Sequence, residues 1–260
     1  MHGMEKVPSA LTLAQHRSHD YRFLIRCWRE LVEEAGLRMR ILTRVGGMPV
    51  YGLESKSPDD GRPEIYISAG VHGDEVAGPW GLLEWARENG ALLRERRFLL
   101  FPAMNPVGMI LNTRMDHQGR DLNRSFHELE DELMVAWRKL MEGRKLAIGL
   151  CLHEDYDGQG CYLYELNKTR KTIGKAVLQD CAEVIAVDGR RSMDGSRSNE
   201  GLIAKRKIPV LPGLPEAIVL HELGAPVALT FETPSEFSLV DRVRAQKTFI
   251  TSALKHACVL

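Results

Sequence analysis

The sequence has few features that would tie the protein to a membrane, to nucleic acid or to an oxidising compartment. No stretch approaches the roughly 18 apolar residues of a membrane span, and the first 20 residues contain no apolar core of a signal peptide. The 35 Lys and Arg residues balance 35 Asp and Glu residues, so there is no basic surplus for nucleic acid. The five cysteines are scattered without a CxxC pair, which favours buried thiols in a reducing compartment. We therefore expect a cytoplasmic protein that binds neither membranes nor nucleic acid.

The chain also lacks the usual nucleotide-binding motifs, since neither a GxGxxG sequence nor a P-loop is present. Its composition, with 44% hydrophobic and 27% charged residues, is that of a globular protein. A length of 260 residues suits one large α/β domain or two small ones. We expect a single catalytic domain over residues 1–260, with an N-terminal helix and hairpin from 1–60 packed on it.

Apolar spacing and turn residues predict strands that alternate with helices. The predicted helices are 19–35, 75–89, 128–141, 168–183, 215–223 and 239–256. The predicted strands are 37–42, 48–54, 65–70, 97–103, 146–152, 162–166 and 226–232. Residues 104–126 and 189–201 show no clear periodicity and are expected to be loops. This alternation predicts an α/β fold with a mixed, largely parallel sheet flanked by helices on both faces.

Polar side chains follow three of the predicted strands, at the sheet edge where such folds bind their ligands. The first strand leads into His72 and Glu75, another ends at His153, and a third ends at Glu232. Two imidazoles and one carboxylate are sufficient protein ligands for catalytic zinc, with a fourth position open. A single His-x-x-Glu is common by chance and can be a helix cap. The recurrence at separate strand ends favours a metal site.

The loop 104–126 carries a second group of candidates, among them Arg114, Asn123 and Arg124. Guanidinium groups and amides suit the binding of a carboxylate and the stabilisation of a developing oxyanion. For Arg120 in the same loop we favour a solvated surface position. A long loop between two regular elements is itself a mild indication of function.

Together these motifs resemble the zinc carboxypeptidase superfamily, which includes carboxypeptidase A-type peptidases and the succinylglutamate desuccinylase/aspartoacylase branch. The resemblance extends from about residue 65 to 235 and implies a zinc carboxypeptidase-like fold with one Zn²⁺ per chain. It implies that the metal ligands are His72, Glu75 and His153. The matching motifs are His72–Glu75, Asn105–Gly108, Asp121–Arg124, His153 and Phe231–Thr233.

The resemblance also implies roles for four other residues. Glu232 corresponds to the general base, and Arg114 to the arginine that polarises the scissile carbonyl. Asn123 and Arg124 correspond to the pair that holds the free carboxylate of the substrate. The expected activity is a metallocarboxypeptidase that removes a C-terminal residue from a small peptide.

The sequence departs from the carboxypeptidase A-type pattern at the substrate-binding tyrosine. No Tyr occurs between Asn199 and Glu232. Tyr156, Tyr162 or Tyr164 could serve instead, and the sequence does not choose among them. The substrate therefore remains open between a peptide and an N-acyl amino acid, the latter cleaved by a deacylase of the desuccinylase/aspartoacylase type. An inactive carboxylate-binding module is the alternative from another class of protein.

Several further residues compete for roles in the site. His221 and Glu222 begin like a zinc-binding HExxH helix, but Ala225 stands where the second His belongs. Glu236 competes with Glu232 as the base, although it lies beyond the strand end. For the remaining candidates we favour surface polarity over a second metal, and these are Asp116, His117, Asp155 and Asp157.

Overall fold

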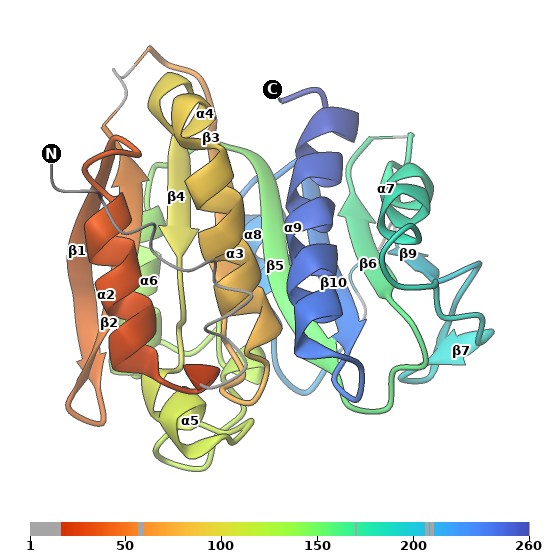
Figure 1. Cartoon of the computed structure of the whole chain (residues 1–260), viewed down its shortest axis with the longest axis horizontal. Helices are drawn as coiled ribbons and strands as arrows, with labels where there is room; N and C mark the ends of the chain where they lie inside the picture. The colour runs from red at the N-terminus through yellow and green to blue at the C-terminus, as the bar shows by residue number, and fades with distance from the viewer. Residues whose placement is uncertain (1–16, 57–59, 170, 206–207, 209–210, 260) are drawn as a thin grey trace, which may run out of the picture.

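Eight strands form one mixed sheet in the computed structural model, which describes residues 17–259 apart from 57–59, 170, 206–207 and 209–210 (Figure 1). Their order across the sheet is β1-β2-β4-β3-β5-β10-β6-β9. Their bounds are β1 Leu37–Val45, β2 Met48–Ser55, β3 Glu64–Ala69, β4 Phe98–Phe101, β5 Leu146–Asp155, β6 Tyr162–Asn167, β9 Leu202–Lys205 and β10 Val227–Pro234. A separate short hairpin joins β7 (Ser192–Met193) to β8 (Ser196–Arg197).

The four central strands β4, β3, β5 and β10 are parallel to one another. All six residues of β3 are buried, as expected for a parallel strand covered on both faces. Strands β1 and β2 extend one side in antiparallel pairing, and β6 pairs antiparallel with β10 on the other. β4, the next strand along the chain, lies on one side of β3, and the later strand β5 lies on the other side of β3. The carboxyl ends of β3 and β5 therefore flank a topological switch point, where α/β folds place their ligands.

Helices cover both faces of the sheet (Figure 1). One face carries α2 Tyr21–Leu31, α3 Ala77–Glu88, α7 Gly174–Cys181 and α9 Leu239–His256. The opposite face carries α6 Glu132–Met141 and α8 Glu216–Glu222. Shorter helical segments are α4 Gly90–Glu95, α5 Pro106–Leu111 and the 3-10 turn Leu122–Arg124. None of the helices in the described part of the chain combines the length and apolarity that crossing a membrane requires.

The predicted fold class is confirmed, and the differences lie in the irregular segments. The expected loop 104–126 contains α5 and the 3-10 turn, and the expected loop 189–201 contains β7 and β8. The predicted helix 168–183 is wrong in its first turns, because α7 begins only at Gly174. There the Asn167 side chain accepts from Thr169 N at 2.7 Å and donates to Lys171 O at 3.0 Å. These bonds favour a turn over a helix.

The turn between β3 and α3 packs closely against the start of α5. A Cβ atom on Gly73 would lie 2.0 Å from the carbonyl carbon of Gly108, so only glycine fits there. In α5, the Asn105 side chain caps the helix by accepting from Gly108 N at 2.9 Å. Asn105 Nδ2 also donates to Met115 O at 3.1 Å. These contacts bring the loop that carries Arg114 to the carboxyl end of β3.

Candidate metal centre and active site

His72, Glu75 and His153 come together at the carboxyl ends of β3 and β5. Each offers a ligand atom, and these atoms lie within 4.8 Å of one another with all three side chains buried. The two imidazole rings lie 4.9 Å apart, centroid to centroid. Within the residues described, this is the one group of three His, Cys, Asp or Glu side chains close enough to share a metal ion. The three ligands expected from the sequence are therefore neighbours in the fold.

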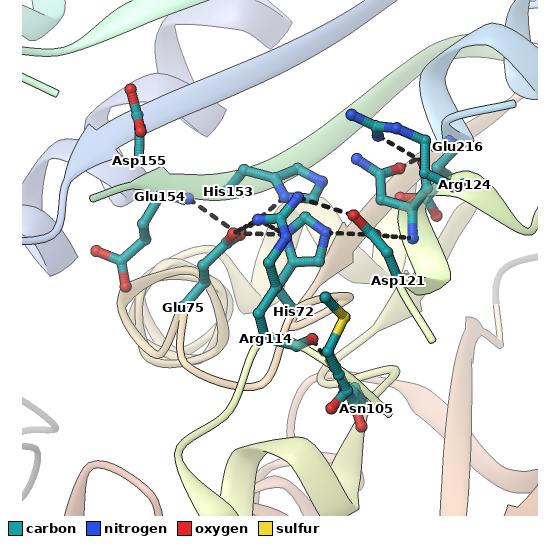
Figure 2. Close-up of polar contacts among 12 residues, drawn as sticks. His72, Glu75, Asn105, Arg114, Asp121, Arg124, His153, Glu154, Asp155 and Glu216 are labelled. Carbon is teal, nitrogen blue, oxygen red and sulfur yellow. Dashed lines mark hydrogen bonds and ion pairs between the residues drawn. The ribbon is translucent and has the colours of Figure 1, made fainter. Parts of the chain in front are cut away.

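Each ring nitrogen of His72 faces a carboxylate oxygen. Nε2 lies 3.0 Å from Asp121 Oδ1, and Nδ1 lies 2.5 Å from Glu75 Oε1 (Figure 2). A neutral imidazole has one N–H donor, so it can serve only one of these two carboxylates as a donor. Burial lowers the pKa of His72, but the Glu75 carboxylate and the bond to Asp121 outweigh it and raise the pKa to about 9. Without a metal, the two neighbouring carboxylates therefore favour the protonated form of His72.

Glu75 is the acidic centre of the group. Its Oε2 lies 2.8 Å from His153 Nδ1 and accepts from Glu154 N at 3.1 Å. Burial raises the pKa of Glu75, yet the His72 and His153 charges and hydrogen bonds outweigh it and hold the pKa well below its usual range. Glu75 is thus an anion that directs both oxygens at the Nδ1 atoms of the two histidines.

This donor set fits a divalent metal ion. The Asp121 carboxylate accepts from Nε2 of His72 and so leaves the Nδ1 lone pair for a cation. Because metal ligands must be deprotonated, metal binding at these residues would release a proton. Two imidazole nitrogens and one carboxylate suit zinc as well as several other divalent ions. His72, Glu75 and His153 would be the protein ligands.

Glu232 lies beside the metal ligands on the neighbouring strand. In the register of β10 and β5 it stands directly opposite His153, and its side chain is half-buried against the cavity. Burial raises its pKa to about 8; the His153 charge opposes this rise and the Glu75 charge adds to it. The rival candidate Glu236 is exposed and lies outside the cavity lining. Of the two candidates for the base, Glu232 is therefore the one that lines the cavity.

Arg114 reaches the ligand group from the loop after α5. Its Nη1 lies 3.1 Å from His72 Nδ1 and 3.3 Å from Glu75 Oε1, and its Nη2 lies 3.1 Å from Asp121 Oδ2. Burial lowers the pKa of Arg114, but Asp121 and Glu75 outweigh that and raise it. With a side chain 41% exposed, the guanidinium faces both the ligand group and the cavity. It can therefore approach an oxygen held beside the metal.

Asn123 and Arg124 line the same cavity from the 3-10 turn. The Asn123 side-chain oxygen accepts from Glu216 N at 3.0 Å, so its amide nitrogen is the atom available to a bound ligand. Arg124 is exposed, and its Nη1 donates to Asn123 O at 2.9 Å. An amide donor and a guanidinium side by side can hold one carboxylate.

The cavity has a volume of about 260 Å³ and extends from His72 and Glu75 past Glu232 to the strands β6 and β9. Tyr162 and Tyr164 line it, whereas Tyr156 is 73% exposed and lies outside the lining. The Tyr162 hydroxyl donates to Asp155 Oδ2 at 2.9 Å, and the Tyr164 hydroxyl donates to Asp194 Oδ2 at 3.0 Å. Of the three candidates for a substrate-binding tyrosine, the two that line the cavity are therefore Tyr162 and Tyr164 on β6.

The weaker candidates lie apart from the ligand group. His221 is on α8 and contributes neither to the ligand group nor to the cavity lining. Asp116 is bound by Arg120 at 2.7 Å, which gives Arg120 a structural contact in place of the expected solvated position. Asp155 lines the cavity but is not in the ligand group, and its carboxylate accepts from Tyr162 and from Asp157 N.

The sequence interpretation gave no role to Asp121 or Glu154. Asp121 bonds His72, Arg114 and the backbone N–H of Asn123, and so links His72 to the loop 104–126. The available signal was its place two residues before Asn123, where an Asp commonly caps a turn. Glu154 directly follows His153, and its side chain lies on the opposite face of the strand. The sequence pattern does not indicate its contacts there.

The chain is similar to several known proteins. Residues 61–145 match the family model of the succinylglutamate desuccinylase/aspartoacylase catalytic domain. A proposed metallopeptidase from Shewanella denitrificans OS217 has a similar structure, with a TM-score of 0.83 and 25% identity over 94% of this chain and 92% of that chain. A second, from Shewanella amazonensis SB2B, has a TM-score of 0.81 and 23% identity over 92% and 93% of the two chains.

A metallo-carboxypeptidase from Burkholderia cenocepacia shares the fold at 16% identity, with a TM-score of 0.67 over 90% of this chain and 68% of that chain. The family match covers about a third of the chain, and the structural similarity shows that the chain has a carboxypeptidase-like fold.

Proposed function

We propose that the protein is a zinc-dependent metallocarboxypeptidase that hydrolyses the C-terminal peptide bond of a small peptide. The observation that carries the proposal is the meeting of three groups in one cavity. These groups are the His72–Glu75–His153 cluster, the half-buried Glu232, and the neighbouring amide and guanidinium of Asn123 and Arg124. Such an arrangement supports cleavage of an amide bond adjacent to a free carboxylate.

Each residue of the chain has a distinct task in this proposal. Arg124 and the amide of Asn123 hold the terminal carboxylate, which orients the scissile bond and makes the attack nearly unimolecular. Glu232 accepts the proton of the attacking water on its carboxylate and returns it to the leaving amine. Arg114 donates to the carbonyl oxygen as negative charge develops there. Bound zinc supplies a Lewis acid and lowers the pKa of water toward about 7.

An N-acyl amino acid deacylase is the second candidate, and the family match over residues 61–145 favours it. Both reactions break an amide bond next to a carboxylate with the same residues. They differ in which part of the substrate the cavity encloses. The size of the acyl portion therefore separates the two activities.

The test is a panel of short peptides and N-acyl amino acids that end in the same residue, assayed with and without zinc. A carboxypeptidase releases the terminal amino acid from the peptides at least about tenfold faster than from the acyl compounds, measured as kcat/KM. The reverse preference identifies the deacylase. An inactive binding module would bind the substrates and release no amino acid, even when it is loaded with zinc.

A further inference from the structure

The ends of β5 and β10 place two pairs of residues directly opposite each other. His153 stands opposite Glu232, and the next pair is Glu154 opposite Thr233. Successive side chains of a strand point to opposite faces of the sheet, so His153 and Glu232 share one face, and the side chains of Glu154 and Thr233 lie on the face covered by α3 and α9. Figure 2 shows the Glu154 carboxylate extending away from the His153 ring. Glu154 and Thr233 therefore lie together on the face of the sheet opposite to His153 and Glu232.

Glu154 connects three elements through one buried carboxylate. Its Oε1 accepts from Ala77 N, at the start of α3, at 2.8 Å. Its Oε2 accepts from Arg242 Nη1 of α9 at 2.5 Å and from the Thr233 hydroxyl of β10 at 3.3 Å. Only 4% of Glu154 is exposed, so water does not compete strongly for these bonds. The Glu154 carboxylate thus joins β10 and α9 to the start of α3, which comes two residues after Glu75.

Gln246 adds a second connection from α9, one turn after Arg242. Its Nε2 donates to His153 O at 2.7 Å and to the Thr233 hydroxyl oxygen at 3.1 Å. Residues four apart in a helix share a face, so Arg242 and Gln246 approach the two strand ends from the same side. Gln246 is fully buried. The backbone of the metal ligand His153 is therefore bound to α9.

The same segment also contacts a metal ligand directly, because Glu154 N donates to Glu75 Oε2 at 3.1 Å. We infer that Glu154, Thr233, Arg242 and Gln246 form a positioning network through which α9 sets the spacing between the metal ligands and Glu232. This inference rests on the proposed function for the roles of the site residues. The four side chains act through their neighbours and touch no reacting atom.

Such positioning has measurable consequences because catalytic groups must be held within about 0.5 Å of their productive geometry. A displacement of about 1 Å can cost about 100-fold in rate. Residues that orient metal ligands typically contribute about 10- to 100-fold to metal affinity. A network that holds His153 and Glu232 in register affects both quantities, whereas a contact that only stabilises the fold affects neither.

The test uses Thr233→Val, which removes the hydroxyl and keeps the branched shape. We expect the zinc dissociation constant, measured by competition with a chromogenic chelator, to rise about 10-fold. At saturating zinc, kcat should fall at least about 10-fold with KM nearly unchanged. Thr233→Ser keeps the hydroxyl and should restore both values. Gln246→Met tests the same network if Thr233→Val fails to fold.

The matched control is Ser252→Ala, also on α9, where the hydroxyl donates to Asp180 at 2.7 Å away from the site. It should lower the melting temperature without changing zinc affinity or kcat. Zinc affinity and kcat within about twofold of wild type in both Thr233→Val and Gln246→Met would overturn the inference. Equal losses in Ser252→Ala would do the same. Zinc affinity needs no turnover, so this result is distinct from a failure of the proposed reaction.

Discussion

Asp121 offers the most informative single perturbation of the metal centre. Its Oδ1 accepts from His72 Nε2 at 3.0 Å and from Asn123 N at 2.9 Å, and its Oδ2 binds Arg114 Nη2 at 3.1 Å. The His72 and Arg114 contacts outweigh burial and hold the pKa of Asp121 below its usual range. Asp121→Asn keeps the shape but replaces one acceptor oxygen with a donor and removes the charge.

The expected loss follows from the contact between His72 and Asp121. A carboxylate on the far nitrogen of a metal-binding histidine fixes the tautomer and makes the imidazole a better ligand, typically worth about 10- to 100-fold in affinity. This range corresponds to about 1.4–2.7 kcal/mol at 1.36 kcal/mol per decade. We expect Asp121→Asn to weaken zinc binding by this amount.

Zinc affinity of the purified variant is measured by competition with a chelator of known affinity. The matched control is Asp116→Asn, which removes a charge from the same loop, where Asp116 binds Arg120 at 2.7 Å. The control should retain the affinity of the wild type within about threefold. Unchanged zinc binding in Asp121→Asn, or an equal loss in Asp116→Asn, would refute the link between Asp121 and the metal.

Three other predictions concern the ligands and the base. Glu232→Gln should bind zinc normally and lose about 100- to 10,000-fold in kcat; turnover near the wild-type value would remove Glu232 from its role. His153→Ala should contain much less than one zinc per chain by elemental analysis, because only two of the three protein ligands remain. Full zinc occupancy would exclude His153 as a ligand. In chelated protein, the His72 pKa of about 9 lies above its usual value of 6.5, so its stabilising contribution is complete below about pH 6.5 and is lost as the pH rises through 9. The melting temperature should fall between pH 7 and about pH 10, and His72→Gln should flatten that fall; an equally steep fall in His72→Gln would contradict the assignment.

The fold could be predicted because its strands and helices carry strong local patterns. The strand 65–70 and the helix 239–256 were expected close to their observed bounds, β3 Glu64–Ala69 and α9 Leu239–His256. In contrast, β9 has only four residues and is completed by pairing with β6. Such a short segment depends on its neighbours more than on its own sequence, which is why it was not predicted.

The residues of the site likewise differ in how far the sequence predicts them. His72, Glu75 and His153 could be proposed because each follows a recognisable strand, and parallel strands bring their carboxyl ends to one edge. The contacts of Asp121 and Glu154 depend on which face or loop meets which neighbour. The bond from Glu154 to Arg242 joins residues 88 positions apart, and no local pattern in the sequence encodes it.

The central claim is that a metal and a carboxylate-binding pair act together on one amide bond. The most direct measurement compares hydrolysis of the same peptide with a free terminal carboxylate and with a terminal carboxamide, by zinc-loaded and by chelated protein. We expect rapid cleavage only of the free carboxylate form and only with zinc, with a preference of at least about 100-fold. Equal cleavage of the carboxamide, or full activity after zinc has been removed, would contradict it.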